Sequence, residues 1–433
     1  NADGSNGQVL TTNGSGTLSF TTISGGGANA INDLSDALTE SNSIYLGSNP
    51  SSTTSSANYN AALGYNALSK LTTGDFNAAL GYVALNTNTG GAYNAAEEDR
   101  ALLANATEVS NIAIGYEAVR SNTTAHNNTA VGVNALVTNT SGEKNVAIGN
   151  NATYHTTSGS QNVSLGFEAM KVNTTGSNNV AIGYQTLFSI TTQSDNTAVG
   201  NYALRSNTGA RNVAMGYTAG YANTSGVDNV AIGYSALRFN TTAGNNTALG
   251  YAALYYNTTG GNNVAIGQNA LANNTIASYN TAIGVSSGSL MTTGNYNTIL
   301  GRFNGNQNGL DIRTGNNNIV LADGVGNPRV RVNSLGYLGI RNLNPGTTFA
   351  VLSDAANHAS QFQVANNGYA GALWYNASGT LVGQVQINAS STNYATTSDY
   401  RLKENLIDLT GAAHRVQQLA PKRFNFIEDA DRT

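Results

Sequence analysis

The chain alternates apolar and polar residues in short stretches that recur at a fixed interval. A typical stretch reads N-V-A-I-G, which in an extended strand places Val and Ile on one face and Asn, Ala and Gly on the other. Between Asn60 and Gly301 the recurring template is N-x-A-[I/L/V]-G-Y-x-A-L-x-x-N-T-T-G-x-x. The glycine and the N-T-T-G joint interrupt helical periodicity every few residues. The pattern therefore predicts one short strand per repeat.

The glycine that ends each strand marks a period of 17 residues. The period is kept except where Glu98 takes the glycine slot and where one joint before Gly216 is a residue shorter. Helical solenoids have longer units, so the period favours a parallel β-solenoid or β-roll. We expect an all-β chain with about fifteen coils over 59–327 and a looser further unit at Asn318. Each glycine should lie at a bend that needs positive φ or close backbone approach.

Stacked coils place like residues above one another at intervals of about 4.8 Å. The Asn column should then form a ladder of side-chain amide hydrogen bonds. In Asn145–Gly149 we expect Val146 and Ile148 to fill the coil interior and Ala147 to lie on a small, uncharged outer face. Since neither face carries charge, that outer face should pack against other copies, most simply as a homotrimer. The alternative is a monomeric solenoid with a featureless outer wall.

Low charge is the most unusual feature of the composition, at 10% charged residues with 49 glycines in 433 residues. A stacked coil repeats any charge as a ladder of like charges, which is destabilising across strands, and Asn and Thr supply polarity without that repulsion. With 19 basic and 23 acidic residues the chain has no excess of positive charge, so we expect no nucleic-acid partner. No apolar run approaches about 20 residues, so we expect no membrane insertion. The absence of cysteine removes disulfides and thiolate chemistry.

The segments outside the repeats have a different pattern. Region 1–58 is expected to be a β-rich linker with two short strands around a Gly-Ser turn, followed by about two helical turns over Ile31–Asn42. Region 328–397 is expected to be a small β-rich trimeric region that begins with a hairpin over Arg329–Ile340. Region 398–433 forms the last expected domain.

The C-terminal region carries the most specific motif, S-D-Y-R-L-K-E-N at Ser398–Asn405, followed by V-Q-Q-L-A-P-K-R-F-N-F. It resembles the start of the intramolecular-chaperone peptidase family found at the ends of phage tailspikes and tail fibres. That family's motif, S-D-x-R-L-K-x-N, is matched at every fixed position: Ser398, Asp399, Arg401, Leu402, Lys403 and Asn405. The family module is longer than Ser398–Thr433, so we expect only its beginning in this sequence.

The resemblance implies a module that drives trimerisation and then cuts itself off at the Thr397–Ser398 bond. Ser398 would be the nucleophile and Lys403 its base, with Asp399, Arg401 and Asn405 as supporting motif residues. The chemistry is reasonable in itself, because a serine hydroxyl needs an adjacent base and burial can lower the pKa of a lysine enough for that role. The pair is five residues apart, so it must meet through a turn or across chains. Taken without the motif, both would be read as surface residues.

The repeats resemble those of trimeric autotransporter adhesin heads, which are left-handed parallel β-rolls. The matching stretches are N-N-V-A-I-G at Asn178–Gly183 and D-N-V-A-I-G at Asp228–Gly233. Similar arrays are also found in phage tail fibres. Together with the C-terminal motif, this predicts an extracellular virion protein, a structural tail fibre for host-surface recognition. Its expected partners are two further copies, other virion tail proteins and a host cell-surface glycan or protein.

Two other functions stay open. A bacterial trimeric surface adhesin would have the repeats but would need a membrane anchor in place of the C-terminal motif. A polysaccharide-degrading tailspike would need two carboxylates facing one cleft, whereas the acids of the repeats mostly occur singly. The densest acids, Glu97, Glu98 and Asp99, could hold a cation or form a solvated bulge. The four histidines are too scattered for a metal set, so we expect neither metal nor cofactor.

Overall fold

The computed structural model describes residues 8–12, 18–22, 37–47, 50, 56–341, 343–344, 349–351, 370–375, 381–388 and 391–396. Strands and turns make up these residues, and the all-β prediction is confirmed. No helix in this part of the chain is long and apolar enough to cross a membrane. Two compact units divide at Leu352 and Ser353, and each is described separately.

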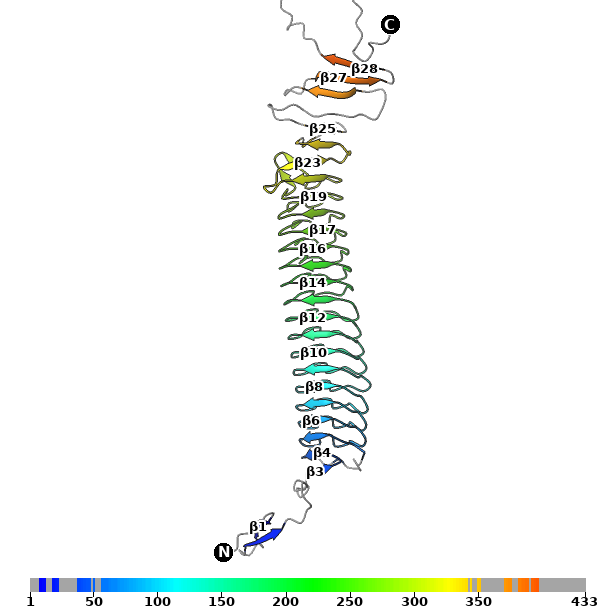
Figure 1. The fold of residues 1–433 in the computed structure, drawn as a ribbon, viewed down its shortest axis with the longest axis vertical. Helices are drawn as coiled ribbons and strands as arrows, with labels where there is room; N and C mark the ends of the chain where they lie inside the picture. Colours follow the sequence, from blue (N-terminus) through cyan, green and yellow to red (C-terminus); the bar gives the residue numbers. More distant parts are fainter. Residues whose placement is uncertain are drawn as a thin grey trace, which may run out of the picture. The chain divides into compact units, whose positions relative to one another are not determined.

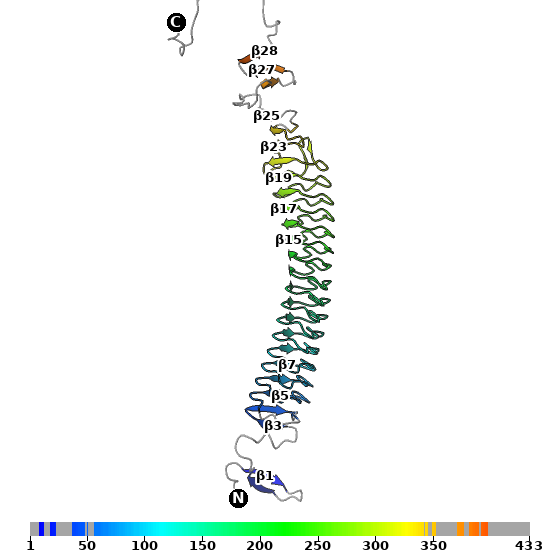
Figure 2. The same ribbon diagram turned by 90° about the vertical axis from the view of Figure 1, so that its right-hand side faces the viewer.

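A long parallel sheet runs through the repeats, with one three-residue strand in each coil (Figure 1). Its first coil strand is β5 (Ala61–Leu63) and its fifteenth is β19 (Thr298–Leu300). Each strand pairs in register with the next, as in Val146 opposite Val163. Figure 2 shows the strands along one side of the stack and the loops along the other. The strands between β5 and β19 are β6 (Ala78–Leu80), β7 (Ala95–Glu97), β8 (Ile112–Ile114), β9 (Thr129–Val131), β10 (Val146–Ile148), β11 (Val163–Leu165), β12 (Val180–Ile182), β13 (Thr197–Val199), β14 (Val213–Met215), β15 (Val230–Ile232), β16 (Thr247–Leu249), β17 (Val264–Ile266) and β18 (Thr281–Ile283).

The expected looser unit at Asn318 is also present as a further coil. Strand β22 (Ile319–Ala322) pairs in parallel with β19. The Asn318 backbone N–H donates to the Asn297 side-chain oxygen at 2.9 Å, as in the regular coils. The preceding coil, between β19 and β22, has extra residues that form a small hairpin of β20 (Asn306–Gln307) and β21 (Leu310–Asp311). The stack therefore extends one coil beyond the regular repeats.

A hairpin occupies the N-terminal end of the stack, where the sequence pattern predicted a helix over Ile31–Asn42. Strand β3 (Ala37–Glu40) pairs antiparallel with β4 (Ser43–Leu46), and β4 pairs in parallel with β5. The helix prediction is wrong for 37–42, and 31–36 lie outside the described residues. Strand β4 covers the edge of β5 and leaves its own edge open, and an extended β3 satisfies the backbone groups of that edge whereas a helix would not. Ser41 and Asn42 both have positive φ, as a tight hairpin turn requires.

Short strands precede and follow the coils in the sequence. The predicted hairpin over Arg329–Ile340 is confirmed, since β23 (Pro328–Val332) pairs antiparallel with β24 (Leu338–Ile340). The predicted N-terminal pair of strands is also confirmed. The remaining elements are β1 (Gln8–Thr12), β2 (Leu18–Thr22) and β25 (Phe349–Val351), and, in the second unit, the antiparallel sheet of β26 (Ala370–Tyr375), β27 (Leu381–Asn388) and β28 (Ser391–Thr396).

The first Asn of each repeat closes its own coil and joins it to the next. The Asn145 side-chain amide donates to the Gly159 carbonyl at 2.9 Å, across the two ends of one coil. The Asn145 side-chain oxygen accepts the backbone N–H of Asn162, one coil further on, at 3.0 Å. These side chains are buried throughout the stack, so each satisfies backbone groups that water cannot reach. The predicted Asn ladder is confirmed, with backbone groups as its main partners.

A second Asn column, in the N-T-T-G joint, fixes the turn opposite the strand. The Asn139 side-chain amide donates to the Gly142 carbonyl at 2.9 Å, and the Gly142 N–H donates back to the Asn139 oxygen at 3.1 Å. Neighbouring members also bond to each other, as where Asn257 donates to Asn240 at 2.9 Å. Both Asn columns therefore fix local coil geometry as well as stacking.

The coil interior is filled from the face opposite to the predicted one. Ala147 is fully buried, whereas Val146 is half-buried and Ile148 is 37% exposed. The prediction that Val146 and Ile148 fill the interior is wrong. The Asn side chains draw the two sides of the coil together, and Ala and Leu-type residues of the return segment, such as Ala169 and Met170, fill the remaining space. Because the interior is close-packed, the space left for the strand side chain is only the size of a methyl group, which Ala fills.

Where a buried residue departs from the template, a residue packed against it in the same or the adjoining coil differs as well and compensates for the change. Gly288 takes a position that holds Leu in most coils, and the larger Ile299 occupies the space of the usual strand Ala. A Cβ added at Gly288 would approach Ile299 Cδ1 at 3.2 Å. In another pair, Thr153 replaces Leu and Ser164 replaces Ala, and their hydroxyls hydrogen-bond at 2.5 Å. Buried volume and buried polarity are thus balanced locally.

The strand-ending glycines meet both expected requirements. Gly233 has φ +130, and a Cβ there would lie 2.5 Å from the Gly250 carbonyl oxygen of the next coil. Glu98 stands in the same slot with φ 90, where a non-glycine residue is strained.

Replacing Asn229 with Asp should destabilise the stack by about 3 kcal/mol, because the variant loses the amide that donates to the Ala243 carbonyl and leaves a buried carboxylate. Thermal or denaturant unfolding measures the change. The matched control is Asn245→Asp, at an exposed position one residue before the next ladder Asn. Equal effects of the two substitutions would contradict the role assigned to the ladder.

Replacing Glu98 with Gly should stabilise the chain by about 1 kcal/mol, because relief of backbone strain exceeds the entropic cost of glycine. The midpoint of thermal unfolding should rise. Glu143→Gly, where no positive φ is required, should lower it. A fall with Glu98→Gly would show that this slot is unstrained.

Candidate functional site

The predicted catalytic residues lie outside the described residues. These are Ser398 and Lys403, the Thr397–Ser398 bond, and the supporting residues Asp399, Arg401 and Asn405. Their roles stay predictions from the motif. The candidate sites of the described chain are instead surfaces of the coils.

The outward side of the strands forms a continuous apolar surface, here called the outer strand face. It comprises the first and third residues of each strand from β5 to β19. Five of these positions are Thr, one is Glu97, and all the others are apolar. Ile114, Leu165 and Leu249 are about two-fifths exposed, in contrast with the buried middle residue of each strand, which is usually Ala. The surface therefore combines regular strand geometry with almost no charge.

Aromatic ladders run beside the outer strand face. The residue after the strand glycine is often Tyr, and successive rings stack, with centroids 5.3 Å apart for Tyr217–Tyr234 and 5.2 Å for Tyr234–Tyr251. On the other edge, Phe76 stacks on Tyr59 and Tyr93 at 4.9 and 5.1 Å. Since stacked rings extend the apolar surface on both sides, the face is wider than the strands alone.

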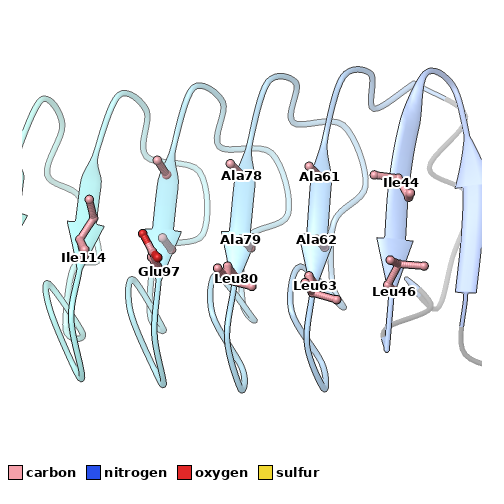
Figure 3. Close-up of a pocket in the computed structure, with 12 residues that line it drawn as sticks. Ile44, Leu46, Ala61, Ala62, Leu63, Ala78, Ala79, Leu80, Glu97 and Ile114 are labelled. Carbon is pink, nitrogen blue, oxygen red and sulfur yellow. The ribbon is translucent and has the colours of Figure 1, made fainter.

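A hollow of about 330 Å³ interrupts the outer strand face near its N-terminal end. Figure 3 shows why: Ala61 and Ala78 present methyl groups where later strands carry Val, Ile or Thr. Leu63, Leu80 and Glu97 form the adjoining row, with Glu97 directly between Leu80 and Ile114 in register. The one carboxylate of the face therefore lies beside its one widened space.

The run Glu97, Glu98 and Asp99 does not converge on a common point. Glu97 lies on the outer strand face, Glu98 takes the glycine slot, and Asp99 lies 3.8 Å from Arg100. Within the described ranges, no group of three or more His, Cys, Asp or Glu side chains could hold a metal ion. These acids fit the solvated-bulge alternative.

Carboxylates elsewhere in the coils pair with neighbouring cations. Glu117 accepts from Arg100 at 3.0 Å and from Arg120 at 2.9 Å. Burial would raise the pKa of Glu117, but these hydrogen bonds outweigh it and hold the pKa below its ordinary value. Glu168 likewise has a lowered pKa, because the hydrogen bonds from Lys171 and Gln185 outweigh burial. Both carboxylates stay ionised and serve structural pairing.

One surface feature was missed in the sequence because it appears only when every 17th residue is compared. The tenth residue of seven successive coils alternates between aromatic and basic, and this set is here called the side column. Its members are Tyr154, Lys171, Phe188, Arg205, Tyr221, Arg238 and Tyr255.

Comparison with known proteins adds no identification. No family model, no curated protein and no solved structure matches the chain. Arguments about function therefore rest on the outer strand face, the side column and the C-terminal motif.

Proposed function

We propose that the protein is a structural fibre of a bacteriophage tail that attaches to the host surface as a homotrimer. The observation that carries the proposal is the outer strand face, which presents apolar residues over fifteen coils with Glu97 as its only charge. Monomeric soluble proteins rarely expose contiguous apolar patches beyond a few hundred Å². A face of this length calls for a partner with the same repeat.

A further copy of the chain supplies that repeat. Three copies around an axis along the stack would bring the outer strand faces together, coil against matching coil, and cyclic symmetry would close the assembly. The stacked tyrosines beside the strands would extend each contact. The trimer thus uses Val, Ile and Leu side chains as its interface, whereas the strand alanines fill the interior of each chain.

The phage assignment is supported by the motif at Ser398–Asn405, which resembles the start of the self-cleaving chaperone module of tail fibres and tailspikes. A bacterial trimeric adhesin would share the repeats but not this motif. The proposal places the protein in the virion, with other tail proteins and a host cell-surface glycan or protein as its partners.

Charge on the outer strand face should break the trimer. The double variant Ile148→Asp and Ile182→Asp should be monomeric in sedimentation or light-scattering measurements, because association would bury six carboxylates. The matched control, Ser158→Asp and Thr192→Asp, adds the same charge to the same coils at exposed loop positions and should stay trimeric. A monomeric wild type, or a trimeric Ile148/Ile182 variant, would contradict the interface.

Self-cleavage should depend on Ser398. Expression of the full gene should give a fragment boundary at Thr397–Ser398, detected by mass spectrometry. Ser398→Ala should abolish it because the nucleophile is lost, and Lys403→Gln should do the same because the base is lost. Ser391→Ala is the control and should be cut normally. Equal cutting of all four proteins would refute the assigned roles.

A further inference from the structure

The side column is a regular strip of half-buried side chains in the turn segments. Adjoining coils hold it in register through backbone hydrogen bonds beside it. The Ser189 N–H donates to the Arg205 carbonyl at 3.0 Å, and the Ala222 N–H donates to the Arg238 carbonyl at 2.9 Å. Every member therefore has the same place in its coil, and the basic residues recur at every second coil, about 10 Å apart.

Cation–π contacts order the basic groups on the rings. The Arg205 guanidinium lies 5.2 Å from the Phe188 ring centroid, and the Lys171 ammonium lies 6.0 Å from the same ring. Arg238 lies 6.0 Å from the centroids of both Tyr221 and Tyr255. A guanidinium stacked on a ring keeps its N–H donors at its edge, free for a planar anion.

The two arginines also lack a carboxylate partner within the described coils. Arg205 donates its Nε–H to the neutral Gln185 side chain at 3.0 Å. Arg238 Nε is buried and has no hydrogen-bond partner. Lys171, in contrast, is paired with Glu168 at 2.6 Å. Neither arginine thus forms a salt bridge with a described acid, although the Glu168 carboxylate lies close enough to Arg205 to attract its charge.

Folding does not require this alternation. The same position of the coil holds Leu103, Val137 and Ala272 in other repeats, and these coils have the same strand and the same ladder. Aromatic and basic residues in seven successive coils therefore add a surface property to a coil that forms without them.

We propose that the side column binds an acidic glycan laid along the stack. The arginines would pair with carboxylate, sulfate or phosphate groups of the glycan, and the rings between them would pack against the apolar C–H faces of its sugars. This deepens the proposed function and rests on it, because it names the class of host-surface molecule and the place where it binds.

A glycan fits better than a nucleic acid. Nucleic acids carry a charge on every nucleotide and are bound by broad basic surfaces. The side column has only three basic residues, one of them already paired, in a chain of net charge −4. Sparse charge between aromatic rings suits a polymer whose anions are spaced by neutral sugar surface.

Binding can be measured directly on defined probes. The wild-type chain is tested against oligogalacturonate, a heparin oligosaccharide and a glycerol-phosphate teichoic acid, with methyl-esterified oligogalacturonate as the neutral probe and single-stranded DNA as the alternative polyanion. At least one acidic glycan should bind at least tenfold more tightly than the neutral probe and the DNA. Failure of all three acidic glycans, or tighter binding of DNA, would overturn the proposal.

The double variant Arg205→Gln and Arg238→Gln should weaken that binding by at least tenfold, because each substitution removes a charge-assisted hydrogen bond. The control is Arg211→Gln and Arg313→Gln, which removes the same charge at exposed arginines paired with Asp228 and Asp311. It should bind as the wild type does. Equal binding by the side-column variant and the wild type would overturn the proposal.

Adsorption to a panel of bacteria separates this inference from the proposed function. If the wild type and the Arg205/Arg238 variant adsorb equally, the fibre function stands and the side column is not its receptor site. If no bacterium is bound while acidic glycans still bind through the two arginines, the side column stands and the host-attachment function fails.

Discussion

The structure depends on one interaction, the hydrogen bonds of the Asn that begins each repeat. A single amide side chain donates to the carbonyl at the far end of its own coil and accepts the N–H of the next Asn in the ladder. Only a group with both a donor and an acceptor can do this, and a neutral one is needed because the site is buried. Coil closure and coil stacking are therefore the same event, which explains why the period is kept so strictly.

The closed coil determines what the rest of each repeat can be. The interior accepts a strand Ala and a Leu-type residue, so the larger strand residues face outward and create an apolar surface. Within the coil strands β5 to β19 Glu97 is the only charged residue, and several charges of the loops are paired, as Glu168 is with Lys171. Gly at the strand end lets the carbonyl of the following coil approach. Low charge, high glycine content and an apolar face thus have a common cause.

The period and the strands could be predicted from the sequence, because stacking imposes the same residues on every coil. The side that faces inward could not, since alternation shows that Val146 and Ala147 lie on opposite faces but not which face is interior. The width of the coil decides which face is interior, and the Asn hydrogen bonds set that width. The N-terminal hairpin was also missed, because pairing of 37–40 with β4, which itself lies on the edge of β5, overrides the local preference. Ser398 and Lys403 stay predictions from the motif alone.

The most direct test of this account is hydrogen exchange of Asn side-chain amides, followed by NMR in heavy water. The account predicts that ladder residues such as Asn145 and Asn229 keep their amide hydrogens for hours, because these groups are buried and bonded to carbonyls. Exposed residues such as Asn178 and Asn245 should exchange before the first spectrum. Equally fast exchange in both sets would contradict the claim that this Asn side chain closes and joins the coils.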